Sequence, residues 1–138
     1  MARVNLAGSD EAPLLVELYC KALRAAAMHK EACAEERRDE LIRLLEGRCM
    51  DQAFWIMRDD KGPFALAHFE RERNEIVTVV VRDDMERKGV ATELVRALQA
   101  KENFLKGLPV TRGGKALLQK CGFVPEQTGP YWSWRRTC

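Results

Sequence analysis

The segment formed by residues 76–91 constrains the fold more than any other part of the sequence. Residues 76–81 are all β-branched, and a single threonine is the only polar side chain among them. This run ends in a charged turn, and a helical pattern begins directly after Gly89. Because the first N–H groups of a helix have no partner inside the helix, a glycine-containing turn at that point leaves amides free to bind an anion. Arg87 and Lys88 add positive charge beside these amides, so the segment predicts an anion cradle between a strand and a helix.

The size and composition of the chain indicate one globular domain that spans residues 1–138. A chain of this length buries roughly 65 to 70% of its unfolded surface on folding. Hydrophobic residues make up 46% of the chain and charged residues 32%, the balance of a protein that folds in water. No apolar stretch approaches the ~20 residues of a membrane span, and residues 1–8 lack the core of a secretory signal. We therefore expect a cytoplasmic protein that has no contact with a membrane.

The cysteine and histidine content argues against a metal site. The five cysteines include no C-x-x-C pair, and His29 and His68 are the only histidines. We expect no metal, and we expect the cysteines to be reduced thiols, most of them small apolar side chains of the core.

The net charge of +2 conceals a difference between the two halves of the chain. Residues 1–69 carry 10 basic and 12 acidic side chains, whereas residues 70–138 carry 13 basic and 9 acidic ones. A positive bias in the half that holds the cradle suits a phosphorylated small ligand. The bias is too weak to argue for nucleic acid by itself.

Hydrophobic periodicity predicts alternating groups of helices and strands. Helical spacing follows a short strand at residues 3–7, first after Pro13 and then over about residues 30–45, with Gly47 as the expected end. Three antiparallel strands are predicted at residues 53–58, 64–70 and 76–81. A helix over residues 90–103, a short segment at 108–110, a helix at 115–120 and a last strand at 131–135 complete the order.

This order, together with its central motif, resembles the GNAT superfamily of acetyl-CoA-dependent N-acetyltransferases. The family signature Q/R-x-x-G-x-G/A, placed after the fourth strand, corresponds to residues 86–91, with Gly89 at the first glycine position. Gly122 and Phe123 give weaker support further along the chain. The resemblance implies an α+β GNAT-like fold, with a mixed, mostly antiparallel central sheet of about six to seven strands flanked by about four helices.

The resemblance also implies where acetyl-CoA binds. The pantetheine arm would lie along the fourth strand, pairing with its backbone, and an amide near Val80 would polarise the thioester carbonyl. The pyrophosphate would lie in the cradle, and Thr111 stands where many members have an asparagine. The implied cofactor-binding residues are Val79, Val80, Val81, Arg87, Lys88, Gly89, Val90, Ala91, Thr92 and Thr111.

Three side chains are candidates for proton transfer to and from the reacting groups. Glu75 lies 14 residues before Gly89, the spacing of the catalytic glutamate in one branch of the family, and is the candidate base that deprotonates the amine. His68 has a suitable intrinsic pKa for proton relay. The usual tyrosine acid of the family is replaced by Leu118, so Tyr131 is the candidate acid that reprotonates the CoA thiolate.

The expected activity is direct transfer of an acetyl group from acetyl-CoA to an amine acceptor. The acceptor is left open among small molecules, proteins and nucleic acids, because residues 25–31 and 126–130, which would select it, carry no strong charge signature. Glu86, which replaces the usual glutamine or arginine, and Leu118 leave a non-catalytic acyl-CoA-binding or sensing module as an alternative. An acyltransferase that acts on nucleic acid is a second alternative, and a homodimer is the default assembly.

Overall fold

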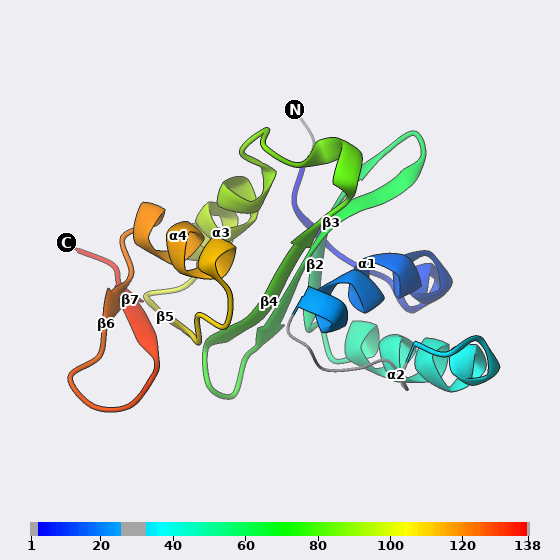
Figure 1. Cartoon of the computed structure of the whole chain (residues 1–138), viewed down its shortest axis with the longest axis horizontal. Helices are drawn as coiled ribbons and strands as arrows, with labels where there is room; N and C mark the ends of the chain where they lie inside the picture. Colours follow the sequence, from blue (N-terminus) through cyan, green and yellow to red (C-terminus); the bar gives the residue numbers. More distant parts are fainter. Residues whose placement is uncertain (1–2, 26–32, 138) are drawn as a thin grey trace.

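The computed structural model describes residues 3–25 and 33–137 (Figure 1). The elements in chain order are β1 Asn5–Leu6, η1 Ser9–Glu11, α1 Ala12–Ala25, η2 Glu35–Arg37, α2 Arg38–Met50, β2 Phe54–Asp59, β3 Gly62–Glu70, β4 Glu75–Val81, η3 Asp83–Met85, α3 Val90–Lys101, β5 Phe104–Gly107, α4 Arg112–Lys120, β6 Val124–Pro125 and β7 Trp132–Arg135. The predicted α+β class, with a mostly antiparallel sheet and helices around it, is confirmed.

Within the described residues, the strands form one seven-stranded sheet in the order β1-β2-β3-β4-β5-β7-β6. The neighbours β1 to β4 pair antiparallel, and the three successive antiparallel strands predicted within residues 53–81 are confirmed. Only β4 and β5 run parallel, and their pairing is short, with Glu75 opposite Lys106 and Ile76 opposite Gly107. Beyond Ile76 the two strands separate, so the sheet opens at its centre (Figure 1).

Two hydrophobic clusters cover the two faces of this sheet. One packs α3 and α4 against the sheet through residues such as Leu94, Leu98 and Leu118. The other packs α1 and α2 against the opposite face through residues such as Leu15 and Leu45, both fully buried. The helices therefore hold the separated strands from both sides, which fixes the opening between β4 and β5.

Several predicted element boundaries are wrong. The second helix does not end at Gly47 but continues to Met50, because Cys49 is buried in the core and the end of the helix is capped by Asp51. Residues 30–32 lie outside the described residues, and Ala34 is extended rather than helical. The helix predicted over residues 90–103 ends at Lys101, and Phe104 begins β5, Phe104–Gly107, so the segment 108–110 is a connection and not a strand. The side-chain amide of Asn74 donates to the carbonyl of Phe104 at 2.8 Å, a contact between distant residues that helps to place β5.

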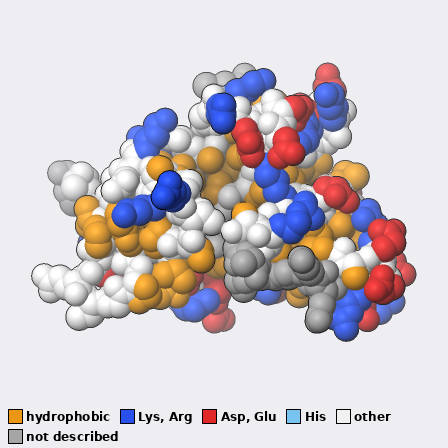
Figure 2. Space-filling view, viewed as in Figure 1, with side chains coloured by type: hydrophobic (Ala, Val, Ile, Leu, Met, Phe, Trp, Pro, Cys, Tyr) orange, Lys and Arg blue, Asp and Glu red, His pale blue; other side chains and the backbone are white. Residues whose placement is uncertain are grey.

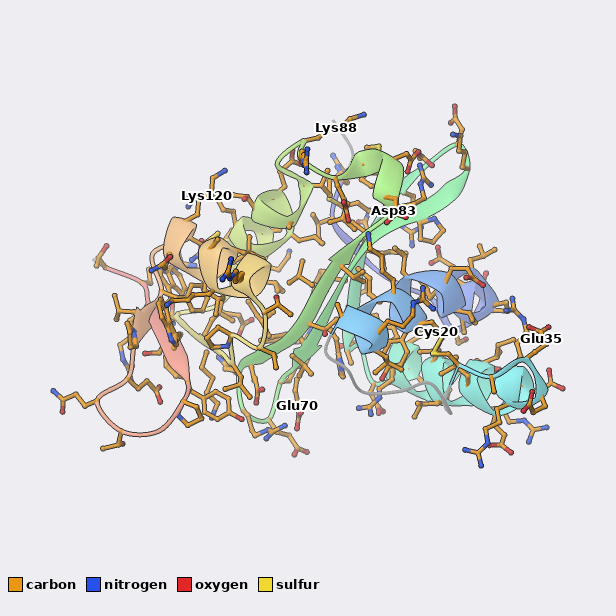
Figure 3. All side chains as sticks on the ribbon, viewed as in Figure 1. Cys20, Glu35, Glu70, Asp83, Lys88 and Lys120 are labelled. Atoms are coloured by element: carbon orange, nitrogen blue, oxygen red, sulfur yellow. A yellow bond between two sulfur atoms is a disulfide. The ribbon has the colours of Figure 1, made fainter. Side chains whose placement is uncertain are left out.

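The expectation of reduced thiols is wrong for two of the five cysteines. Cys20 of α1 and Cys33 form a disulfide, with Cα atoms 5.8 Å apart (Figure 3). Cys49 and Cys121 are buried free thiols, as expected of core residues. Burial raises the pKa of the Cys49 thiol to about 11 and also raises that of Cys121, so neither is a reactive thiolate at neutral pH.

None of the described helices is long and apolar enough to cross a lipid bilayer.

Candidate functional site

The opening between β4 and β5 contains a cavity of about 680 Å³. Its walls come from β4, the turn after β4, the start of α3, residues 107–111, α4 and the end of α1. In Figure 2, hydrophobic side chains lie in the recess between the side of α3 and α4 and the side of α1, and Lys and Arg side chains border it. The cavity is large enough for an extended ligand that is apolar along its length and anionic at one end.

A bulge in β4 directs the open edge of this strand into the cavity. His68 of β3 lies opposite Thr78 and Phe69 lies opposite Ile76, so Val77 is an extra residue on β4. The backbone N–H of Arg82 donates to the carbonyl of Phe64 at 2.7 Å. Because antiparallel pairing alternates between the two edges of a strand, Val80 faces β3, whereas Val79 and Val81 present their N–H and C=O groups to the cavity. The cavity edge of β4 therefore offers the amides of Val79 and Val81, and not the amide of Val80.

The predicted cradle lies at one end of the cavity. Arg87 and Gly89 both have positive φ angles, +62° and +77°, and α3 begins directly after Gly89. Left-handed residues in a turn direct successive N–H groups towards one point, the geometry of an anion-binding nest. A Cβ atom at Gly89 would meet nothing within 4 Å, so the space in front of the turn is open. Within residues 3–25 and 33–137, neither Arg87 nor Lys88 forms an ion pair.

Most of the predicted cofactor-binding residues line the cavity. They are Val79, Val80, Val81, Arg87, Gly89, Val90, Ala91, Thr92 and Thr111. Lys88 does not line the cavity and projects from the turn into solvent (Figure 3). Thr111 also caps α4, since its hydroxyl accepts a hydrogen bond from the Gly114 N–H at 2.9 Å.

Lys21 of α1 also lines the cavity, although sequence reasoning did not identify it. Its ammonium donates a hydrogen bond of 2.5 Å to the carboxylate of Glu86. Glu86 occupies the first position of the signature. The unusual acidic residue at position 86 signalled that a counter-charge was needed. Nothing local indicated a lysine 65 residues earlier in the chain.

Glu75 lies where β4 and β5 are still paired, one residue before the cavity wall begins at Ile76. The residue is buried, with 6% exposed, and its Oε1 atom has no hydrogen-bond partner among the residues that the structure describes. The cation that pairs with it is Arg73, whose Nε lies 3.6 Å from Oε1 but donates its hydrogen bond to Glu70 instead. A buried carboxylate oxygen without a donor is an available proton acceptor.

Tyr131 lies on the same face of the sheet as Glu75. Lys106 is opposite Glu75 in the sheet, and its ammonium lies 4.7 Å above the ring of Tyr131. The hydrogen bond with Glu70 raises the pKa of Arg73, and the negative charge of Glu75 acts in the same direction. The structure thus groups two of the three proton-transfer candidates around Arg73 and Lys106, although neither Glu75 nor Tyr131 belongs to the cavity wall.

His68 lies apart from this group and from the cavity wall. It is 6% exposed, and its ring packs edge-on against Phe54 with the centroids 5.2 Å apart. Burial, assisted by the positive charge of Arg48, lowers the pKa of His68 to about 4. At neutral pH the ring is therefore uncharged, as a packed core histidine is expected to be.

Over the part of the chain that the structure describes, no group of three or more His, Cys, Asp or Glu side chains is arranged to hold a metal ion. Residues 26–31, most of the first segment expected to select the acceptor, lie outside the described residues.

Comparison with solved structures identifies the fold. An N-acetyltransferase from Staphylococcus aureus Mu50 superposes with a TM-score of 0.66 at 14% identity, covering 98% of both chains. An acetyltransferase of the GNAT family from Streptococcus agalactiae 2603 gives a TM-score of 0.69 at 12% identity, covering 99% of this chain and 96% of that one. A GNAT superfamily phosphinothricin acetyltransferase from Sinorhizobium meliloti, solved in complex with AcCoA, gives 0.70 at 12% identity, covering 97% and 88%.

No family model matches the sequence, and no curated protein matches it. The structural likeness extends over nearly the whole chain. The chain therefore has the GNAT fold, as its signature at residues 86–91 predicts.

Proposed function

We propose that this protein is an N-acetyltransferase that transfers an acetyl group from acetyl-CoA directly to an amine. The main support is the cavity, which joins an open strand edge at Val79 and Val81 to the cradle at Arg87 and Gly89. This arrangement matches a ligand with a peptide-like arm and a pyrophosphate. A neighbour with the same fold was solved with AcCoA bound, which favours acyl-CoA over other ligands of that shape.

The residues present fit acetyl-CoA in charge and in shape. The open space at Gly89 suits the pyrophosphate, and so does Arg87, which forms no ion pair with the described residues. The apolar cavity wall suits the pantetheine arm. When bound, acetyl-CoA supplies an activated thioester, so the protein has to position an amine, remove its proton and stabilise negative charge on the carbonyl oxygen.

Each of these tasks has a candidate group in the chain. The N–H of Val79, directed into the cavity, is the donor for the developing oxyanion, in place of the amide near Val80 that the sequence indicated. The orphaned Oε1 of Glu75 is the proton acceptor for the amine. The Tyr131 hydroxyl is the candidate donor of the proton that returns to the leaving thiolate. His68 is the weakest candidate, because it lies away from the cavity wall and carries no charge at neutral pH.

Calorimetric titration with acetyl-CoA tests the cofactor site directly. The informative variant is Gly89→Asp, which places a carboxylate in the cradle and should abolish binding. Gly129→Asp is the matched control, since Gly129 has nearly the same φ, +80° against +77°, has no neighbour within 4 Å and lies outside the cavity wall. Micromolar binding by the wild type and by Gly129→Asp, but not by Gly89→Asp, is expected. Failure of the wild type to bind acetyl-CoA would refute the proposal.

Turnover separates the proposed enzyme from the alternative of an acyl-CoA-binding or sensing module. An enzyme releases CoA in the presence of an amine acceptor, and release falls in Glu75→Gln, whereas a sensor binds acetyl-CoA without releasing CoA. If the acceptor is a nucleic acid, the protein should bind DNA or RNA with an affinity that falls steeply as the salt concentration rises.

A homodimer and a cytoplasmic location stay predictions. The Cys20–Cys33 disulfide removes one argument for a reducing compartment, because disulfides are rare in cytosolic proteins.

A further inference from the structure

Lys21 connects α1 to the turn that precedes the cradle through three hydrogen bonds from one ammonium group. Its Nζ donates to the carbonyl of Val81 at 2.6 Å, to Oδ1 of Asp83 at 2.5 Å and to Oε1 of Glu86 at 2.5 Å. All three acceptors lie at the end of β4 or in the turn that follows, 60 to 65 residues away from Lys21 in the sequence. The side chain is 29% exposed and lines the cavity.

The turn before the cradle is unusually acidic for a site that has to receive a pyrophosphate. Asp83, Asp84 and Glu86 all precede Arg87, and Figure 2 shows acidic and basic side chains next to one another at this rim. Asp84 is neutralised on the outer side by Arg82 at 2.5 Å and by Lys61 at 3.8 Å. Glu86 is the carboxylate that lines the cavity.

Among the described residues, the ion-pair partner of both Asp83 and Glu86 is Lys21. Without this lysine, Glu86 would present an uncompensated negative charge one residue before the left-handed Arg87 of the cradle. Like charges at the edge of a partly desolvated cavity repel strongly, because they are less screened there than in bulk water.

We propose that Lys21 is a residue of the pyrophosphate site, which cancels the charge of Glu86 and holds the turn in the conformation that opens the cradle. This inference rests on the proposed function, and it assigns to α1 a role at the phosphate end of the cavity. It also explains how a glutamate is tolerated at the first position of the signature. Asp83, the other partner of Lys21, is 88% exposed, so its charge is screened by solvent, and the Glu86–Lys21 pair at the cavity is close to neutral, as a glutamine would be.

The decisive comparison is between Lys21→Met and Glu86→Gln, because both variants break the same ion pair but leave opposite charges behind. Lys21→Met leaves Glu86 uncompensated and should weaken acetyl-CoA binding by about tenfold or more. Glu86→Gln leaves Lys21 beside the cradle and should bind at least as tightly as the wild type. The double variant should recover most of the loss, and Lys21→Arg should stay close to the wild type.

Lys61→Met is the matched control, because Lys61 pairs with an acidic residue of the same turn but lies outside the cavity wall. It should leave the affinity unchanged, and thermal melts of every variant check that the fold is retained. If the ion pair acts only as a tether between α1 and the turn, Lys21→Met and Glu86→Gln will weaken binding equally. That result, or a Lys21→Met variant that binds like the wild type, would overturn the inference and leave the proposed function intact. Absence of binding by the wild type would instead refute the proposed function, and the inference with it.

Discussion

Acidification should destabilise this protein through His68 well before the carboxylates are fully protonated. The imidazole is buried against Phe54, and burial lowers its pKa from 6.5 to about 4 in the folded state. At pH 7 the ring is neutral in both the folded and the unfolded chain. Below pH 6.5 the unfolded chain binds a proton that the folded chain does not accept until about pH 4. The free energy of unfolding therefore falls as the pH is lowered through this window.

The two pKa values set the size of the effect. One unit of pKa difference corresponds to about 1.4 kcal/mol, so the loss relative to pH 7 is about 2 kcal/mol at pH 5 and about 3 kcal/mol at pH 4. Carboxylates that pair with arginines, such as Glu11 with Arg58, have lowered pKa values and lose stabilisation in the same direction at still lower pH. The contribution of His68 must therefore be measured as a difference between two proteins.

Urea unfolding of the wild type and of His68→Leu at several pH values between 4 and 8 gives this difference. The leucine variant lacks the ring contact with Phe54, which changes its free energy of unfolding by the same amount at every pH. It also lacks an imidazole that could be protonated at this position. Between pH 7 and pH 5, the free energy of unfolding should fall by about 2 kcal/mol less for the leucine variant than for the wild type. Equal acid slopes for the two proteins would refute the reasoning, and so would an imidazole NMR titration of the folded wild type near pH 6.5.

Three other perturbations test the site and its supports. Glu75→Gln should lower kcat/KM by about 10²- to 10⁴-fold with little change in acetyl-CoA affinity, whereas the exposed Glu72→Gln of the neighbouring turn should have no effect. The Cys20–Cys33 disulfide closes a loop with a sequence separation of 13. Reduction with dithiothreitol should therefore lower the free energy of unfolding by about 3 kcal/mol, and the stability of the Cys20→Ala/Cys33→Ala double variant should not change with dithiothreitol. Thr111→Ala removes the side-chain cap of α4 and should cost about 1 kcal/mol in urea unfolding, and Thr111→Ser should restore most of it.

The features that were predicted correctly depend on neighbours in the sequence. The three antiparallel strands follow from nearly continuous apolar runs separated by short turns, and the turn before α3 follows from one glycine between a strand and a helix. At Gly89 the backbone adopts a left-handed φ that favours glycine, so the signature residue and its conformation are locally linked.

The errors arose where distant contacts override local preference. Glycine is a residue type typical of helix ends, yet α2 continues past Gly47 because Cys49 is buried in the core beneath the helix. The position of β5 depends on pairing with β4 and on the contact of Asn74 with Phe104. Neither contact produces a recognisable hydrophobic pattern in the sequence of this four-residue strand. The disulfide likewise joins two cysteines that have no motif in common.

By itself, the sequence determined the α+β class, the order of the elements and the place of the cradle, because propensity, periodicity and turn chemistry act over a few residues. Only the tertiary structure decided that β4 and β5 separate after Ile76, that the Val79 amide faces the cavity, and that Lys21 pairs with Glu86. These features are set by the packing of helices on both faces of the sheet and by a one-residue bulge. Such contacts join residues far apart in the chain, and their energies cannot be read from either residue alone.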